Sequence, residues 1–278
     1  MGLNDLCLVF LPDALIPECD DMRFMAASGW RVKMRRFRGA PSEVVIMPIK
    51  DQKSDLLQVG DDLTIFTGVT KYHKPVPAHL QGVAKGNFPA FIPKTDELNY
   101  QRYGELVEQL GGMRFYITEK ADGSSTTAFR YKGQFGLCSR NLELERNENN
   151  GYWKVAAKYK VEERLPEGVA LQWETIGPGI QSNPHGLSDI DGLAFSAYNI
   201  EEHRYFTYHE LKKLCETIEF PMCRVIEEGE SFSSEGIELL GEGTYANGKQ
   251  REGVVVRSQE NVGTLPISFK VINLGYER

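Results

Sequence analysis

Residues 119–126 read EKADGSST, and they place one lysine between two acidic residues where two strands are expected to meet. The preceding run MRFYITEK has a strand-like pattern that ends at Glu119, and the following TTAFRY predicts the next strand. Gly123 and the two serines after it favour a tight turn. We expect this turn to hold the amine of Lys120 in a cleft between strands, although a lysine is more often a solvated surface charge.

The residue types around this lysine predict phosphoryl or nucleotidyl transfer. A lysine is nucleophilic only when uncharged, so its free pKa of about 10.4 must be lowered by desolvation or by nearby cations. The sequence supplies a second lysine, Lys270 in SFKVIN, and carboxylates at Glu174 in QWETIG and Glu252 in REGVVV. Magnesium keeps much of its water, so these two glutamates suit a hydrated metal. Positioning and charge neutralisation around one phosphate are what the reaction needs.

The first part of the chain predicts a small all-β domain. The 278 residues, 41% apolar and 26% charged, have the composition of an ordinary folded protein with room for two domains. Strand-like alternation and β-branched content occur in WRVKMRRF, SEVVIMPI and DLTIFTGVTKY, with turn residues between them. We expect residues 1–80 to form this domain as a barrel.

The second part predicts an α+β domain of antiparallel sheets with flanking helices. Residues 73–97 are rich in Pro and Gly and are expected to link the two domains, with the second at 81–278. Strands are expected at MRFYITEK, TTAFRY, QFGLCS, LQWETI, GLAFSAYNI, GVVVRS and ISFKVI. Helices are expected at YWKVAAKYKVEERL and at TYHELKKLCETI, where Thr207 and Glu210 have capping-box spacing. Such alternation of strands and helices is typical of the α+β class.

The charge distribution bears on nucleic-acid binding. A net charge of −7 argues against a protein that coats nucleic acid nonspecifically, because that affinity comes mainly from Lys and Arg. One local basic stretch, VKMRRFRG, contains Lys33, Arg35, Arg36 and Arg38. It fits a phosphate contact and a charged, protected strand edge equally well.

Cysteine usage and hydropathy predict a cytoplasmic protein. The five cysteines are scattered without C-x-x-C spacing, which indicates neither a disulfide framework nor a zinc site and fits a reducing compartment. The apolar run LCLVFL near the start is too short to cross a bilayer and follows an aspartate rather than a basic stretch. No membrane partner is expected.

Six motifs occur in the order found in the covalent nucleotidyltransferases: EKADGSS, SRN, ETIGPGIQSNP, GLAFSAYNI, REGVVVR and SFKVIN. In that order they resemble the family that includes DNA ligases, mRNA capping enzymes and RNA ligases. The resemblance is greatest to ATP-dependent RNA ligases that carry an oligonucleotide-binding (OB) domain ahead of the catalytic domain. It covers residues 85–278 well and the first domain more loosely. It implies an OB fold at 1–80 and a ligase-type nucleotidyltransferase (adenylyltransferase) domain at 81–278.

The resemblance implies a role for each candidate on the nucleophile's side of the site. Lys120 would attack the α-phosphate of ATP and form a lysyl-AMP phosphoramidate. Glu119 would lie against the adenine through its backbone. Arg140 of the SRN motif would contact the ribose or the RNA end.

The remaining motifs imply the ribose, metal and phosphate contacts. Glu174 resembles the carboxylate that binds the ribose or organises metal-bound water, and Glu252 the one that holds the hydrated metal, Mg²⁺ or Mn²⁺. Phe195 resembles the aromatic residue that stacks on adenine, with Tyr198 as the second choice. Lys270 would hold the α-phosphate and neutralise charge.

The sequence departs from the family pattern in the last motif, and several candidate residues also have simpler structural interpretations. The family often pairs two lysines one residue apart in its last motif, but Ser268 and Ile272 stand at that spacing from Lys270. Glu174 would also fit a surface charge at a strand end, and Phe195 an ordinary core aromatic. The loop GPGIQSNPHGL is rich in turn residues and need not cradle a phosphate, and its histidine has no assigned role.

These observations predict an RNA end-joining enzyme that acts in RNA repair. AMP would pass from Lys120 to a 5′-phosphate, and a 3′-hydroxyl would then displace it. The sequence ends eight residues beyond Lys270, so we expect the OB domain upstream rather than downstream, unlike DNA ligases and capping enzymes. The alternatives are an ATP-dependent DNA ligase or other polynucleotide nucleotidyltransferase, and a nonenzymatic RNA-binding module.

Overall fold

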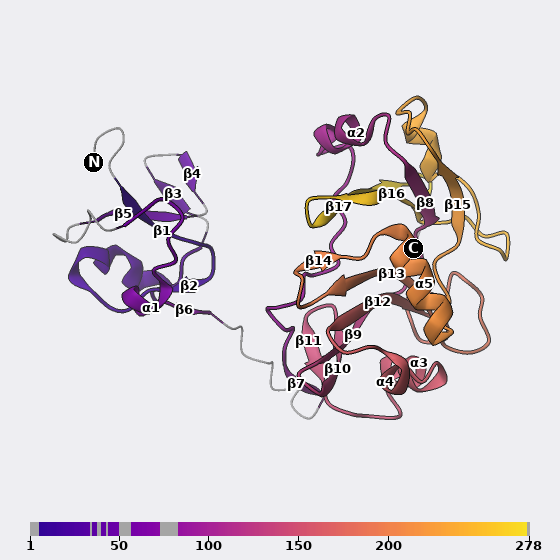
Figure 1. Cartoon of the computed structure of the whole chain (residues 1–278), viewed down its shortest axis with the longest axis horizontal. Helices are drawn as coiled ribbons and strands as arrows, with labels where there is room; N and C mark the ends of the chain where they lie inside the picture. Colours follow the sequence, from indigo (N-terminus) through magenta and orange to yellow (C-terminus); the bar gives the residue numbers. More distant parts are fainter. Residues whose placement is uncertain are drawn as a thin grey trace. The chain divides into compact units, whose positions relative to one another are not determined.

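The computed structural model describes residues 6–33, 35–37, 40–42, 44–49, 57–72 and 83–276, and every structural statement below concerns these residues. The chain divides into two compact units, Met1–Pro75 and Val76–Arg278 (Figure 1). Each unit has its own core.

The first unit contains three antiparallel strand pairs and two helical segments. The pairs are β1 (Cys7–Phe10) with β5 (Val45–Pro48), β2 (Ala14–Leu15) with β6 (Thr70–Lys71), and β3 (Arg35–Phe37) with β4 (Ala40–Ser42). The helical segments are the 3-10 segment η1 (Asp20–Ser28) and α1 (Thr64–Thr67). Met22 and Met25 of η1 are fully buried in the core of this unit.

The described residues of the first unit are not all β, because they include two helical segments, and no closed barrel is found among them. The strand predicted at DLTIFTGVTKY is helical over α1. Asp62 Oδ1 accepts the N–H of Thr64 at the start of this turn, and Gly68, at φ +66°, ends it. Of the basic stretch, Arg38 and the side chains of Arg35 and Arg36 lie outside the described residues.

The second unit consists of two antiparallel sheets with helices beside them, which confirms the predicted mixed fold of antiparallel sheets and helices. The larger sheet has the strand order β14-β13-β12-β9-β10-β11-β7 and the smaller one β15-β8-β16-β17. The larger sheet comprises β7 (Ala84–Asn87), β9 (Ser124–Tyr131), β10 (Gln134–Ser139), β11 (Leu142–Leu144), β12 (Val169–Ile176), β13 (Asp191–Asn199) and β14 (Arg204–Tyr205). The smaller sheet comprises β8 (Phe115–Glu119), β15 (Val225–Gly229), β16 (Gly253–Val262) and β17 (Leu265–Ile272).

Helices α3 (Gly151–Lys158), α4 (Val161–Arg164) and α5 (Tyr208–Ile218) pack on the larger sheet around the buried Trp173. The helix predicted from Tyr152 to Leu165 is interrupted at Lys160, whose φ of +50° separates α3 from α4. Beside the smaller sheet lie α2 (Gly104–Leu110) and the 3-10 segment η4 (Ile237–Gly241), whose apolar residues join the core around Phe269 (Figure 1).

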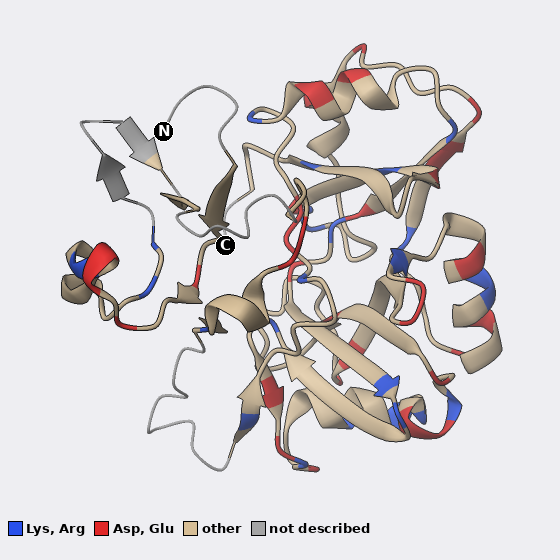
Figure 2. Ribbon diagram, turned by 60° about the vertical axis from the view of Figure 1, so that its left-hand side comes forward, with Lys and Arg blue, Asp and Glu red and all other residues tan. Residues whose placement is uncertain are grey.

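Two locally encoded features appear as predicted. Lys132 and Gly133 both have positive φ and form the tight turn between β9 and β10. Thr207 and Glu210 form the capping box of α5, whose apolar face buries Leu211 and Ile218. The described acidic and basic residues are interspersed along the chain (Figure 2). Among the helices of the described ranges, none has the length and apolar character needed to span a bilayer.

Candidate active site

The stretch EKADGSST forms the connection between the two sheets of the second unit. β8 of the smaller sheet ends at Glu119, and β9 of the larger sheet begins at Ser124, so residues 120–123 cross from one sheet to the other. A pocket of about 380 Å³ opens beside this crossing, with walls from β8, β16 and β17 on one side and β9, β12 and β13 on the other. All seven site residues predicted from the sequence line this pocket: Glu119, Lys120, Arg140, Glu174, Phe195, Glu252 and Lys270.

Lys120 and Glu252 form the ion pair at the centre of the pocket. Lys120 Nζ lies 2.6 Å from Glu252 Oε2, and the lysine side chain is only 22% exposed. The backbone joins the two segments, because the Lys120 N–H donates at 3.0 Å to the carbonyl of Gly253, the residue after Glu252. The amine is therefore held inside the cleft rather than in bulk solvent.

Glu174 faces the same space from the middle of the larger sheet. It is paired in register with Ser125 of β9 and Leu193 of β13, and it is partly buried. Desolvation raises the pKa of Glu174 to about 8, with Glu252 and Asp122 adding like-charge repulsion against the opposing effect of Lys120. At neutral pH Glu174 is therefore mostly protonated, and a bound cation would favour its ionised form.

Glu119 and Lys270 come from β8 and β17, the two strands on either side of β16 in the smaller sheet. Glu119 is buried, so desolvation raises its pKa, and its Oε2 has no hydrogen-bond partner among the described residues. The Lys270 backbone bonds to residues 98 and 100, which fixes the strand, while its Nζ forms no hydrogen bond or ion pair with a described residue. This amine is therefore available to a ligand in the pocket.

Arg140 and Phe195 lie at different depths. Arg140 is well exposed and pairs with Asp96, Nη2 to Oδ1, at 2.5 Å. Phe195 packs beside Ala121 and Ile176 while also lining the pocket. Tyr198, the second choice for an aromatic contact, instead lies in a separate apolar cluster with Phe129 and is not part of the pocket wall.

Sequence reasoning did not assign several residues that complete the pocket. Arg257 of β16 is 3% exposed, forms an ion pair with Glu97, and lies over the ring of Phe195 at 5.9 Å. Ser268 donates to the other carboxylate oxygen of Glu97 at 2.7 Å. Glu97 lies in the stretch interpreted as a linker, and no nearby motif in the sequence indicated that it lines the pocket. The basic residue that ends the apolar run VVVR was the available hint for Arg257.

Gly123 is required by the close packing of the crossing against β12. A Cβ at this position would lie 2.3 Å from the carbonyl oxygen of Thr175 and 2.9 Å from Cγ of Glu174. We expect Gly123→Ala to lower the free energy of unfolding by about 1–3 kcal/mol, because backbone must move to accommodate the methyl group. Urea denaturation measures this change. Gly104→Ala, where a Cβ meets nothing within 4 Å, is the matched control, and an equal loss in both variants would contradict the packing argument.

The pocket fits a hydrated divalent cation better than a directly ligated one. No group of three or more His, Cys, Asp or Glu side chains within the described ranges is arranged to hold a metal ion. Glu174 and Glu252 supply carboxylate oxygens to one polar pocket, and a cation there would offset the repulsion that Glu252 exerts on ionised Glu174. Mg²⁺ and Mn²⁺ prefer such oxygen donors, and Mg²⁺ retains several waters.

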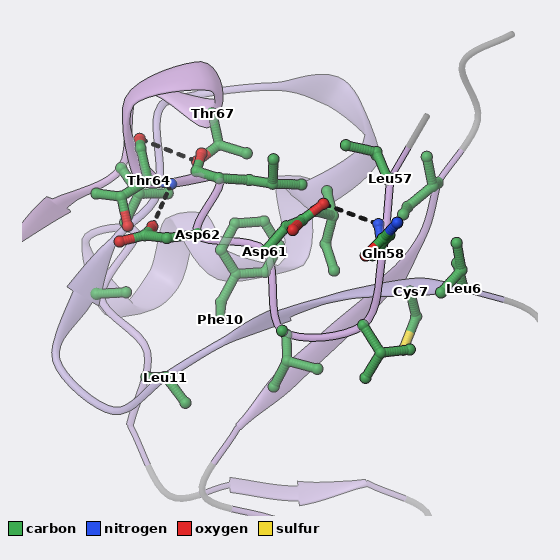
Figure 3. Close-up of a pocket in the computed structure, with 18 of the residues that line it drawn as sticks. Leu6, Cys7, Phe10, Leu11, Leu57, Gln58, Asp61, Asp62, Thr64 and Thr67 are labelled. Atoms are coloured by element: carbon green, nitrogen blue, oxygen red, sulfur yellow. Dashed lines mark hydrogen bonds between the residues drawn. The ribbon is translucent and has the colours of Figure 1, made fainter. Parts of the chain in front are cut away.

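A larger pocket of about 770 Å³ lies in the first unit, but its groups do not form a comparable site (Figure 3). Its two carboxylates serve local turns: Asp61 Oδ2 accepts the N–H of Gln58 at 2.8 Å, and Asp62 Oδ1 accepts that of Thr64 at 2.9 Å. The rest of its wall is largely apolar, from residues such as Leu6 and Leu57. The lysine–carboxylate pair of the second unit has no counterpart in the described lining of this pocket.

Comparison with known proteins agrees with the geometry. The model of the RNA ligase family matches residues 113–272, more than half of the chain. A search of curated proteins gave no match.

Among solved structures, an apo mutant of the Naegleria gruberi RNA ligase is 30% identical, with a TM-score of 0.64, and the match covers 98% of this chain and 85% of that one. A mutant of the same ligase with AMP and Mn is 31% identical, with a TM-score of 0.64 and coverage of 97% and 85%. A third mutant, with ATP and Mn, is 30% identical, with the same TM-score and coverage of 98% and 85%. The protein that carries the Lys120–Glu252 pocket belongs to the RNA ligase family.

Proposed function

We propose that this RNA ligase uses ATP to adenylylate Lys120 and then seals 3′-hydroxyl and 5′-phosphate RNA ends. The observation that carries the proposal is the sheltered amine of Lys120, 2.6 Å from Glu252, in a pocket that also holds Lys270, Arg140 and Glu174. The solved N. gruberi ligases with ATP and Mn, with AMP and Mn, and with PPi support a nucleotidyl-transfer cycle of this kind.

The proposed cycle has three in-line displacements at phosphorus. First, Lys120 Nζ bonds to the α-phosphorus of ATP as the bond to the β-phosphate oxygen breaks, which releases pyrophosphate and a proton to solvent. Second, a 5′-phosphate oxygen of RNA attacks the same phosphorus, and the amine of Lys120 leaves. Third, the 3′-hydroxyl attacks the 5′-phosphorus, AMP leaves, and a phosphodiester forms.

Each pocket residue has a proposed part in this cycle. Lys270, whose Nζ has no described partner, neutralises the α-phosphate, and Arg140 at the exposed edge contacts the ribose or the RNA end. Phe195 stacks on the adenine, while the backbone at Glu119 lies along the base. Arg257 provides a second cation near this wall, although Glu97 already neutralises much of its charge.

A divalent metal, Mg²⁺ or Mn²⁺, would be held by Glu252 and Glu174 through water. When bound, it would supply positive charge to the phosphates and to the developing transition state. Glu252 and Glu174 would orient its water shell, and the low exposure of both side chains would limit competing bulk water.

We further propose that residues 1–80 form an OB-type module and residues 81–278 the adenylyltransferase domain. Support comes from the solved N. gruberi ligases, whose matches extend over 97–98% of this chain and so include the first unit. OB folds bind single-stranded nucleic acid through stacking and basic grooves. A role in RNA repair in the cytoplasm follows as a prediction; the five free cysteines suit a reducing compartment.

Substrate choice is tested with nicked duplexes that differ only in the sugar at the 3′-hydroxyl. We expect sealing when that terminal sugar is ribose and much slower sealing when it is deoxyribose. Equal rates on both would instead favour a DNA ligase or a ligase without sugar selection. Failure to seal either, together with covalent labelling by ATP, would place the chain among other polynucleotide nucleotidyltransferases.

The raised pKa of Glu174 predicts a pH-dependent stability difference. Because its pKa is raised to about 8 in the folded state, protonated Glu174 stabilises the fold at low pH, and this contribution is lost as pH rises from the unfolded value toward 8. In metal-free buffer we expect Glu174→Gln to be more stable than wild type by about 1–3 kcal/mol at about pH 8.5 and equally stable at about pH 4, below the unfolded pKa. Urea denaturation at both pH values checks this; a constant difference would contradict the assigned pKa.

A further inference from the structure

Tyr245 lies just behind the pocket and links the backbones of the two residues that form its central ion pair. The Tyr245 hydroxyl donates to the carbonyl of Lys120 at 3.0 Å and accepts the backbone N–H of Glu252 at 3.2 Å. A tyrosine hydroxyl has one proton to give and lone pairs to receive, so both bonds form at once. The side chain is 2% exposed and is not among the residues that line the pocket.

Tyr245 is itself held in place by a bond of its backbone and by a contact of its ring. The Tyr245 N–H donates to the carbonyl of Lys249 at 2.8 Å, which closes a tight turn, and the ring of His185 packs against it at 4.1 Å between centroids. Burial raises the pKa of Tyr245 to about 12, so the hydroxyl keeps its proton at neutral pH. The donor to Lys120 is therefore constant over the working pH range.

The hydroxyl lies next to a main-chain bond that joins two strands of the smaller sheet. Lys120 N–H to Gly253 O, at 3.0 Å, is the main-chain bond that joins β8 to the start of β16 at this edge. Directly beside it, Tyr245 connects Lys120 and Glu252, whose side chains meet at 2.6 Å. One side chain thus fixes how the nucleophile's segment lies against the segment that carries Glu252.

We infer that Tyr245 is a positioning residue for the adenylylation of Lys120, acting through the backbones of Lys120 and Glu252 without touching the nucleotide. The inference rests on the proposed function of Lys120. Lys120 forms and breaks bonds in the first two steps of that cycle but carries no bond in the third. Loss of the Tyr245 hydroxyl should therefore slow lysine adenylylation more than it slows the sealing of RNA that is already adenylylated.

The test is Tyr245→Phe, which keeps the ring and its packing on His185 and removes only the hydroxyl. Single-turnover labelling is measured with radiolabelled ATP and Mn²⁺ over a range of ATP concentrations, and sealing is measured on a pre-adenylylated RNA strand with the same preparation. We expect the maximal labelling rate to fall by about ten- to hundredfold, because small displacements of a reacting group carry such costs. The ATP concentration at half-maximal rate should stay within about twofold of wild type, which corresponds to less than half of the 1.4 kcal/mol that a tenfold change represents.

The ratio of the two rates separates positioning from loss of folded protein. Unfolded protein lowers both rates equally, whereas mispositioned Lys120 lowers labelling more than sealing. Tyr159→Phe is the matched control, since it removes a hydroxyl that donates to Asp191 at 2.5 Å, and neither of these residues lines the pocket, so the ratio should be unchanged. Equal losses in labelling and sealing by Tyr245→Phe, or no loss in either, would overturn the inference. Absence of any label in the wild type would instead refute the proposed role of Lys120.

Discussion

Replacing Lys120 by alanine is expected to abolish covalent labelling by radiolabelled ATP. The adenylate has no other amine in this position to bond to, and the second lysine of the pocket, Lys270, is placed to hold phosphate. Wild-type protein incubated with ATP and Mn²⁺ and separated under denaturing conditions should carry the label. The expected loss is complete to the detection limit, because covalent chemistry rather than a binding contribution is removed.

The matched control for this variant is Lys85→Ala. Lys85 also pairs with a glutamate at 2.6 Å, but it is 53% exposed and lies on the edge strand β7, away from the pocket. Its removal should leave labelling within about twofold of wild type, since exposed ion pairs contribute little. Labelling of Lys120→Ala at the wild-type level would show that another residue is the nucleophile.

Glu252→Gln is expected to lower the rate of lysine adenylylation by about 10²–10³-fold, the usual effect of removing one preorganised polar group from a reacting centre. The substitution keeps the shape of the side chain but removes the charge that holds Lys120 Nζ and that would hold the hydrated metal. Single-turnover labelling measures the rate, and a titration with Mn²⁺ should show that more metal is needed for half of the maximal rate.

The surface pair again supplies the control. Glu143→Gln removes the partner of Lys85 and should change neither the labelling rate nor the Mn²⁺ dependence. A Glu252→Gln enzyme that labels as fast as wild type at the same Mn²⁺ concentration would remove Glu252 from the proposed metal and lysine contacts.

The parts of the fold that could be predicted from sequence are those set by neighbouring residues. The capping box of Thr207 and Glu210 and the turn at Lys132 and Gly133 each depend on side chains within four positions. The strand predicted at residues 62–72 failed over α1 for a local reason too: β-branched residues favoured a strand, but the Asp62 carboxylate accepts the N–H of Thr64 at the start of a helical turn.

The parts that could not be predicted depend on contacts between distant segments. Closure of a barrel is a long-range property, and alternation of apolar residues in the first unit cannot distinguish a barrel from the three strand pairs described. The pairing of Arg257 with Glu97 joins residues 160 positions apart, and Tyr245 reaches Lys120 across 125. Ordered motifs predicted the seven candidates that line the pocket, but the residues that hold them there carry no comparable pattern.

The most direct measurement is peptide mapping by mass spectrometry after wild-type protein has reacted with ATP and a divalent metal under conditions that preserve phosphoramidates. We expect a single AMP adduct, located on the side chain of Lys120. An adduct on a different residue, or an unmodified Lys120 peptide under conditions in which the enzyme seals RNA, would contradict this expectation.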